Sequence, residues 1–465
     1  MMGQIPPAES AAAELVVGLE SAGITAAARA GALQLLQDQL SLEVGCSTLP
    51  WCEAIAEFAR TSHAPGQSRI VRTGERMSAP DAAFVNGTFG HSFEYDDAHA
   101  ASLSHPGSAV VSAALAVGEE LDADLEQVLV GLIAGYEVYT RIGTLGSPDL
   151  LQRGFHPHAV LSTFGAAATV AKMRGFDFEQ TLNALSIAYS HSSGATEYTS
   201  TGGSIKRVHA GIGTRNGMIS AAMAASGITG PSAFLTGAKG FFRTFAGKEI
   251  SAEAAARFSP EREFEIANPL FKPYCACAYT HSFVDGARSF ADRLDDIDAV
   301  KLSIQSSGDV VVGNSNVNAF APQQIEHLQY SLPFQFALSA TGQGNGYAIH
   351  KAYLDGQLDL GPNSPQAALA ERIEIVVDPT LDGAYAGKMV GRIDVTFADG
   401  SSDSVFVEDS LGSAGNPMDE STRDAKFFDL TESVLGEERA KQLLAAIKGA
   451  GPGSTARELV SLTLS

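Results

Sequence analysis

Cysteine, tryptophan and positive charge are scarce in this chain of 465 residues. It has four cysteines and one tryptophan, and its 31 lysines and arginines face 53 aspartates and glutamates, which gives a formal net charge of −22. This acidic balance argues against nucleic acid and anionic membranes as partners. The cysteines show neither a C-x-x-C motif nor zinc-ribbon spacing, so we expect buried thiols at Cys46, Cys52, Cys275 and Cys277.

Several functional signatures are also missing. The segment Gly237-Ala238-Lys239-Gly240 is not a phosphate-binding loop, and the chain has no G-x-S-x-G nucleophile motif. We find no signal peptide and no long apolar span, so the expected location is the cytoplasm, with no membrane partner. Hydrophobic residues make up 45% of the chain and charged residues 18%, which is typical of a globular protein. The length predicts two domains.

Hydrophobic periodicity predicts a mainly α fold with a second α+β domain. Apolar residues recur at helical spacing in the first half of the chain and again near its end. Alternating apolar and polar residues, typical of strands, appear only in the intervening region. We therefore predict an all-helical domain built from both chain ends, residues 1–264 and 411–465, and an inserted α+β lid domain, residues 265–410. The predicted helices include 125–144, 159–174 and 205–225, and the predicted strands are 300–306, 372–377, 392–397 and 404–408.

The densest group of titratable side chains lies in residues 86–108. This stretch contains three of the 11 histidines of the chain and a carboxylate pair, Asp96 and Asp97. Burying such groups without partners is costly, and a solvated helix face would more usually carry lysine and glutamate. We interpret the stretch, with His91, His99 and His105, as one wall of an active site.

Three further clusters accompany it. Each has a simpler structural explanation, as a structural histidine, an exposed basic turn or a core segment, just as Asp96 and Asp97 could cap or solvate a loop. Together they place acids and imidazoles in the helical domain, and basic groups in glycine-rich or domain-boundary segments, where ligand sites are common. The clusters are His156 with His158, then Lys206, Arg207 and His209, and finally Lys272, Tyr274, Tyr279 and His281.

Proton transfer is the chemistry that this mixture suits. Histidine acts as an acid or a base near neutral pH, and lysine or arginine at a helix start can hold a substrate carboxylate. Two alternatives of other classes stay open. One is a metal-dependent hydrolase with His91, Asp96 and His99 as ligands. The other is a binder of organic acids without catalytic activity.

The order of these motifs resembles the MmgE/PrpD family, which includes 2-methylcitrate dehydratase, cis-aconitate decarboxylase and iminodisuccinate epimerase. The similarity extends through most of the chain. It is carried by Asn86-Gly87, His91, Tyr95-Asp96-Asp97, His99, Ser104-His105-Pro106-Gly107-Ser108, Gly135-Tyr136-Glu137-Val138, Gly154-Phe155-His156-Pro157, Lys206-Arg207-Val208-His209-Ala210-Gly211, Lys272-Pro273-Tyr274, Tyr279-Thr280-His281 and Asn416-Pro417-Met418.

This resemblance implies a homodimeric enzyme without metal or organic cofactor, whose site lies between the helical domain and the lid. Family members remove a proton next to a carboxylate of a di- or tricarboxylate. The resemblance implies catalytic roles for His105, Lys206, Asp96 and His156. For the substrate carboxylates it implies Arg207, Lys272 and His281, with Tyr279 and His99 as further binding candidates.

Two positions depart from the lyase pattern of the family. Ala98 stands where lyase members usually have a threonine, and Ala278 stands where they have an arginine. The missing hydroxyl and guanidinium favour a reaction that only moves protons. We therefore rank an epimerase of the iminodisuccinate type first, and a dehydratase or decarboxylase acting on a methylcitrate- or aconitate-like acid second.

Overall fold

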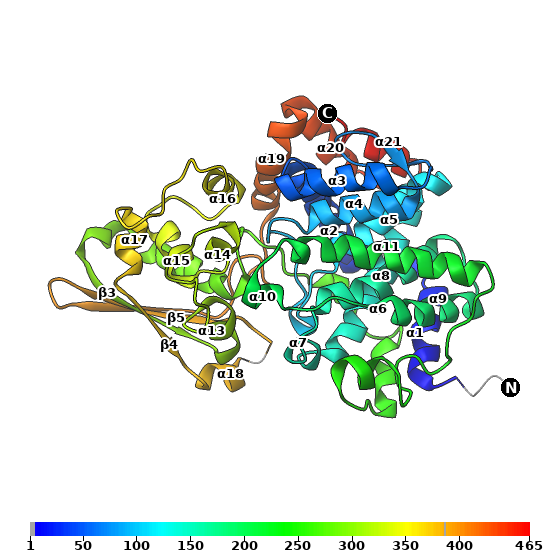
Figure 1. The fold of residues 1–465 in the computed structure, drawn as a ribbon, viewed down its shortest axis with the longest axis horizontal. Helices are drawn as coiled ribbons and strands as arrows, with labels where there is room; N and C mark the ends of the chain where they lie inside the picture. The colour runs from blue at the N-terminus through cyan, green and yellow to red at the C-terminus, as the bar shows by residue number, and fades with distance from the viewer. Residues whose placement is uncertain (1–4, 386) are drawn as a thin grey trace. The chain divides into compact units, whose positions relative to one another are not determined.

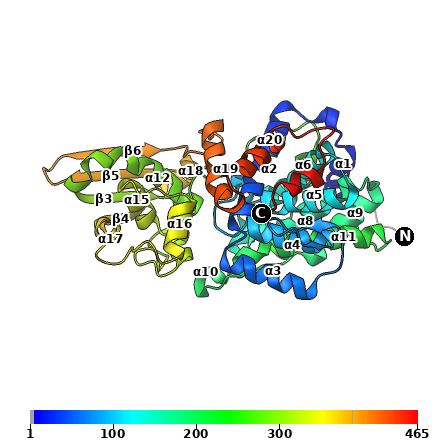
Figure 2. The ribbon, with the colours of Figure 1, turned by 90° about the horizontal axis from the view of Figure 1, so that it is seen from above.

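The computed structural model describes residues 5–385 and 387–465, and the chain divides into two compact units. One unit comprises Met1–Pro269 and Leu430–Ser465, and the other comprises Leu270–Asp429. The first is helical apart from one pair of two-residue strands, and the second combines helices with a four-stranded sheet. The predicted fold class, mainly α with a second α+β domain, is confirmed. Figures 1 and 2 show the elements of each unit from two directions.

Among the described residues, the first unit begins with eighteen elements, and after the second unit it resumes within α19 and continues with two further helices. They are α1 (Pro7–Gly18), η1 (Ser21–Gly23), α2 (Ala26–Cys46), α3 (Pro50–Ser62), β1 (Ser68–Arg69), β2 (Arg76–Met77), α4 (Ala79–Gly90), η2 (Ala100–Ser102), α5 (Gly107–Leu121), α6 (Leu125–Gly146), α7 (Asp149–Gln152), α8 (Pro157–Met173), α9 (Phe178–His191), α10 (Tyr198–Thr201), α11 (Ile205–Ala225), η3 (Phe242–Ala246), η4 (Ala252–Phe258) and η5 (Glu265–Ala267), then α19 (Glu420–Leu435), α20 (Glu437–Lys448) and α21 (Ala456–Ser461).

The helices of the first unit begin where the sequence provides caps. Asp124 accepts a hydrogen bond from the backbone N–H of Gln127 at 2.8 Å, and the Gln127 side chain accepts one from the Asp124 N–H, which forms a capping box at the start of α6. Asp177 and Gln180 repeat this arrangement at α9. Pro157 occupies the first turn of α8, where its missing N–H costs nothing.

Helices α4, α5, α8 and α11 pack side by side and position the site described below (Figure 1). Glycine permits the closest of these approaches. A Cβ at Gly211 of α11 would lie 2.2 Å from the carbonyl oxygen of Phe84 in α4, and one at Gly135 of α6 would lie 2.0 Å from Thr169 Oγ1 in α8. Since such contacts are forbidden, only glycine allows these helices to lie this close together.

Helix α6 is the one described helix that is long and apolar enough to cross a membrane by length and composition. In its most apolar stretch, however, 89% of the residues are buried inside the protein. The buried Glu137 and Arg141 pair across one turn, with Arg141 Nη2 2.7 Å from Glu137 Oε2. A core helix of a folded unit explains this burial, because its apolar residues already pack against protein.

The second unit surrounds a sheet with the strand order β4-β3-β5-β6. β3 pairs in parallel with β4 and antiparallel with β5, and β5 forms a hairpin with β6. Helix α12 packs against β5, β6 and α15 (Figure 2). Phe283 and Phe336 share one buried core with Leu302 and Val395. The elements are η6 (Ala278–Thr280), α12 (His281–Ala287), η7 (Arg288–Asp296), β3 (Ile297–Ile304), α13 (Ser306–Val312), α14 (Ile325–Gln329), α15 (Leu332–Ala340), α16 (Tyr347–Leu354), α17 (Pro365–Ala370), β4 (Ile373–Val377), α18 (Thr380–Ala384), β5 (Gly391–Phe397) and β6 (Ser402–Val407).

Candidate active site

The stretch 86–108 connects the end of α4 to the start of α5 in the first unit. Every residue from Asn86 to His99 is buried, although the segment is rich in polar groups. After α4 ends, the backbone turns through positive φ angles at Glu94 (56°) and Leu103 (50°) before it enters α5 at Gly107. These turns place polar side chains inside the unit, where each one needs a polar partner.

Five histidine rings gather beside this segment. The His91 ring centroid lies 4.3 Å from that of His158, 5.3 Å from that of His105 and 5.9 Å from that of His156. The His156 and His209 rings are 5.2 Å apart, and their Nδ1 atoms are 3.0 Å apart. The rings come from the end of α4, the loop before α5, the start of α8 and the first turns of α11. We call these five residues the histidine cluster.

Asp96 lies between two of these imidazoles. Its Oδ2 is 2.7 Å from His91 Nδ1, and its Oδ1 is 3.7 Å from His105 Nδ1. The Asp96 carboxyl group is fully buried, whereas the His105 side chain is 16% exposed. His105 is therefore the more accessible end of a buried carboxylate–imidazole arrangement.

The hydrogen bond of His105 fixes its tautomer. His105 Nδ1 lies 2.7 Å from the backbone carbonyl oxygen of Asp97. A carbonyl oxygen can only accept, so Nδ1 carries the hydrogen. Proton exchange with another molecule then falls to Nε2, as general acid–base catalysis by histidine requires.

Asp97 has a different role from its neighbour Asp96. It accepts the Gly107 N–H at 3.0 Å, at the start of α5, and the Gln39 amide at 3.2 Å. Burial, together with the nearby Asp96 and Asp38, raises the pKa of Asp97 well above its usual value. The predicted carboxylate pair therefore separates into one group facing imidazoles and one group that caps a helix.

The basic residues of α11 have partners from the same segment. Lys206 forms an ion pair with Glu94. Arg207 donates from Nε to the Ser92 carbonyl oxygen at 3.0 Å, and its guanidinium lies 4.0 Å above the Trp51 ring. The structure thus brings Lys206 to the segment of Asp96 and His105, while it holds Arg207 against the backbone and an aromatic ring.

Burial keeps most of the histidine cluster neutral. Desolvation is the largest cause that lowers the pKa of His91, and it lowers the pKa of His156 and His158 well below the usual value. The same cause lowers the pKa of His209 to about 4. Neutral imidazoles donate and accept hydrogen bonds without adding positive charge to the site.

His99 points to other partners. Its Nδ1 lies 2.9 Å from Ser102 Oγ, and its Nε2 lies 3.3 Å from Glu265 Oε2. These contacts do not group His99 with His91 and Asp96 as a set of metal ligands. Within the described ranges 5–385 and 387–465, no three His, Cys, Asp or Glu side chains are grouped to hold a metal ion.

The remaining predicted residues, Lys272, Tyr279 and His281, belong to the second unit. The Lys272 side chain is buried, and Tyr279 donates from its hydroxyl to Ser307 Oγ at 3.0 Å. His281 Nε2 lies 3.2 Å from the Ala276 carbonyl oxygen. Their expected role in substrate binding stays a prediction.

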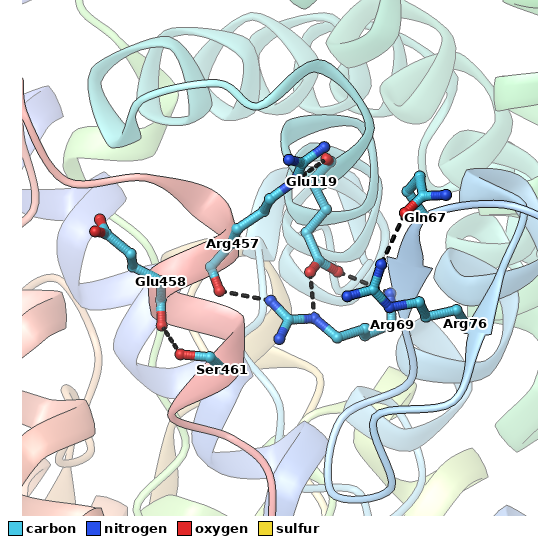
Figure 3. A pocket seen from close by; sticks show the side chains of 7 residues that line it. All are labelled: Gln67, Arg69, Arg76, Glu119, Arg457, Glu458 and Ser461. Carbon is cyan, nitrogen blue, oxygen red and sulfur yellow. Dashed lines mark hydrogen bonds and ion pairs between the residues drawn. The ribbon is translucent and has the colours of Figure 1, made fainter.

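Two cavities of the first unit lie among other residues. One, of about 250 Å³, is lined by charged groups, with Arg69 Nε 2.5 Å from Glu119 Oε1 (Figure 3). A second, of about 420 Å³, lies between α1 and the segment around Phe258. Neither contains a predicted site residue. We call the first the arginine pocket, and its lining residues are Gln67, Arg69, Arg76, Glu119, Arg457, Glu458 and Ser461.

The sequence prediction did not give catalytic or binding roles to three members of the histidine cluster: His91, His158 and His209. Two signals point to them. His158 is a titratable residue directly before the uncharged stretch 159–171, and His209 follows Lys206 by three residues, which places both on one face of a helix. For His91 the sequence indicates a place in the wall of the site or a metal ligand, without a specific catalytic or binding role.

Comparison with known proteins identifies related sequences. The profile of the MmgE/PrpD N-terminal domain matches residues 10–253, and that of the MmgE/PrpD C-terminal domain matches residues 274–449. The chain is 26% identical to the cis-aconitate decarboxylase-like protein oryM of Aspergillus oryzae, over 96% of this chain and 95% of that protein. It is 24% identical to a cis-aconitate decarboxylase of Aspergillus terreus, over 86% and 84% of the two chains, and 25% identical to the human cis-aconitate decarboxylase, over 80% and 77%.

Proposed function

Because the chain belongs to the MmgE/PrpD family of enzymes, we propose that it is a lyase that removes CO2 from a tricarboxylate of the cis-aconitate type. The relatives named as cis-aconitate decarboxylases favour this reaction over the epimerase that the sequence motifs ranked first. The observation that carries the proposal is the geometry of His105. Its hydrogen is fixed on Nδ1, and this nitrogen lies 3.7 Å from Oδ1 of the buried Asp96.

Decarboxylation needs a destination for an electron pair and a source for one proton. When CO2 leaves, the C–C bond breaks and its electron pair stays on the substrate carbon, where conjugation with a double bond and a carboxylate spreads the charge. In the proposed reaction, the imidazolium of His105 gives the proton on Nε2 to the carbon skeleton and forms a C–H bond. The net reaction consumes one proton for each CO2 released, and His105 regains it from solvent.

Lys206 is the proposed partner for a substrate carboxylate. It lies in the first turn of α11, and it already forms an ion pair with the buried Glu94. A buried ion pair of this kind keeps an ammonium group in place inside an acidic protein. His156 would add a neutral N–H donor to the same substrate, since burial lowers its pKa.

An epimerase is the second candidate, and Ala98 and Ala278 are the observations that favour it. In the lyase pattern of the family these positions carry a threonine hydroxyl and a guanidinium, which would bind a leaving group or a carboxylate. Epimerisation requires neither, but it requires proton exchange on both faces of one carbon.

Proton NMR in D2O tests the proposal with cis-aconitate, citrate, methylcitrate and iminodisuccinate as substrates. We expect cis-aconitate to lose CO2, with a new vinyl signal and one deuterium bound to carbon in each product. If deuterium enters the α-position without CO2 release, the result would favour an epimerase and contradict the lyase. No change in any acid would make both wrong.

A chelator separates the proposed lyase from the metal-dependent hydrolase. We expect turnover to continue after the protein has been treated with EDTA and desalted. Loss of turnover that returns with an added transition metal would favour the hydrolase.

A further inference from the structure

His91 is one of the most deeply buried members of the histidine cluster. Its side chain has no exposed surface, and its Nδ1 lies 2.7 Å from Asp96 Oδ2. Its Nε2 is buried and has no hydrogen-bond partner within residues 5–385 and 387–465. An ionised carboxylate only accepts hydrogen bonds, so the His91 hydrogen lies on Nδ1 and points at Asp96.

We propose that His91 is a positioning residue that holds Asp96 as a carboxylate and, through it, sets the protonation of His105. The inference rests on the proposed function, in which His105 delivers a proton. His91 binds one oxygen of Asp96, and the other oxygen lies 3.7 Å from His105 Nδ1. The three side chains thus form a chain of contacts in which only His105 reaches partly to solvent.

The physical need for His91 follows from the burial of Asp96. A buried charged carboxylate is costly unless a donor stabilises it, and a charge-assisted hydrogen bond is one of the strong stabilising contacts. Without this donor, Asp96 would more readily take up a proton and become neutral. His105 would then lose the negative charge that favours its imidazolium form.

His91 is suited to donate as a neutral imidazole. Desolvation is the largest influence on its pKa, and the pKa is lowered overall although Asp96 acts to raise it. The negative charge therefore stays on Asp96, where it acts on His105 instead of being cancelled by an imidazolium at His91.

Other charged and titratable groups surround this chain of contacts. They reach it from the segment before α5, from α2, α6, α8 and α11, and none of them is changed in the test below. They are Glu94, Asp97, Asp38, Tyr139, His156, His158, Lys206 and His209.

Two isosteric amides test the role of His91. In His91→Asn the amide nitrogen can occupy the place of Nδ1 and donate to Asp96, whereas in His91→Gln it lies nearer the place of Nε2. We expect kcat to fall by about 10- to 100-fold in H91Q and H91L, a range typical for loss of an outer partner of a functional group. H91N should keep kcat within a few-fold of the native enzyme, and KM should change little in all three.

The pH profile separates positioning from a merely structural role. The alkaline limb of kcat/KM marks the loss of the imidazolium form that donates the proton. In H91Q and H91L we expect this limb at lower pH, because a weakened Asp96 charge makes that form less favourable; in H91N it should stay in place. Equal losses in H91N and H91Q, or unshifted limbs in both, would overturn the inference.

Nitrogen NMR of the native protein provides a readout that needs neither turnover nor a variant. With 15N-labelled histidine, His91 should be neutral and protonated on Nδ1 between pH 6 and 8. An imidazolium, or a hydrogen on Nε2, would overturn the inference even if every variant of His91 failed to fold. A native enzyme that releases no CO2 while His91 shows the expected tautomer would overturn the proposed function alone.

Discussion

The histidine cluster and the arginine pocket both concentrate polar side chains in the first unit, yet their groups are bound in different ways. In the arginine pocket, Arg69 pairs with Glu119, and Arg76 Nη1 donates to Gln67 Oε1 at 2.7 Å (Figure 3). Arg457 Nε donates to the Glu119 carbonyl oxygen at 2.9 Å. Each guanidinium thus has a partner from the pocket itself.

The histidine cluster instead contains imidazoles, most of which burial keeps neutral, and a buried carboxylate that touches two of them. Its rings contact one another, and His91 Nε2 has no hydrogen-bond partner among the described residues. A concentration of polar groups is therefore a weak indication of function by itself. Titratable groups that are buried and still able to exchange protons are a stronger one.

Removal of the His105 side chain should lower the activity more than any substitution in the arginine pocket does. We expect His105→Ala to lower kcat by about 10²- to 10⁴-fold, the usual contribution of a general acid or base. His63→Gln, at an exposed histidine, is the matched control and should keep full activity. Full turnover in a folded H105A protein would contradict the catalytic assignment.

Removal of Lys206 should have the next largest effect. Lys206→Met takes away the ammonium group that we assign to a substrate carboxylate. Because a hydrogen bond to a charged group contributes about 1.5–3 kcal/mol, kcat/KM should fall by about 10- to 100-fold, mainly through KM. Lys441→Met removes an ammonium that pairs with Glu437 on the surface and should leave KM unchanged; an unchanged KM in K206M would remove Lys206 from substrate binding.

The stability of the protein at acidic pH should depend on His209. Its pKa of about 4 in the folded state lies below the ordinary value of 6.5, so between these values the unfolded state binds more protons. This histidine therefore stabilises the fold fully above pH 6.5, and the contribution is lost as the pH falls towards 4.

His209→Gln should make the free energy of unfolding less dependent on pH within this window. Urea midpoints at pH 4.5, 5.5 and 7 measure the change. An equal pH dependence in H209Q and the native protein would show that His209 is not a source of acid sensitivity.

The smallest effects should come from the arginine pocket. Arg457 forms an exposed ion pair with Asp122, with 3.4 Å between Nη1 and Oδ1, and such pairs contribute about 0–1 kcal/mol. Arg457→Ala should thus lower the melting temperature slightly and leave kcat and KM unchanged. A large loss of activity would show that this pocket and the histidine cluster are not independent.

Much of the helical architecture follows from the sequence alone. Helix α11, a helix of mainly small residues, occupies the predicted residues 205–225. Strand β5 (Gly391–Phe397) closely matches the predicted strand 392–397, because apolar and polar residues alternate there. The four cysteines are free and buried, as expected. The chain is expected to return to the helical domain after residue 410, whereas the second unit extends to Asp429. One contact that ties this extension to the second unit is a hydrogen bond from Lys426 Nζ to the Lys272 carbonyl oxygen, at 3.0 Å. No local sequence pattern reveals this contact.

The candidate site was predictable in part. Family motifs point to Asp96, His105, His156 and Lys206, and the structure gathers all four in the first unit around one buried segment. They do not distinguish Asp96 from Asp97, since two adjacent aspartates look alike until the Gly107 N–H is seen to bind one of them. Nor do they show that His99 turns to Ser102 and Glu265. These distinctions depend on contacts between residues far apart in the chain.

Gly211 affects the candidate site through helix packing. It lets α11, which carries Lys206 and His209, lie against α4, which ends beside His91. A Cβ there would lie 2.2 Å from the Phe84 carbonyl oxygen, so the two helices would have to move apart. The distances between the reacting groups thus depend on how the helices pack. Substitutions far from the substrate can therefore change the activity as strongly as substitutions that touch it.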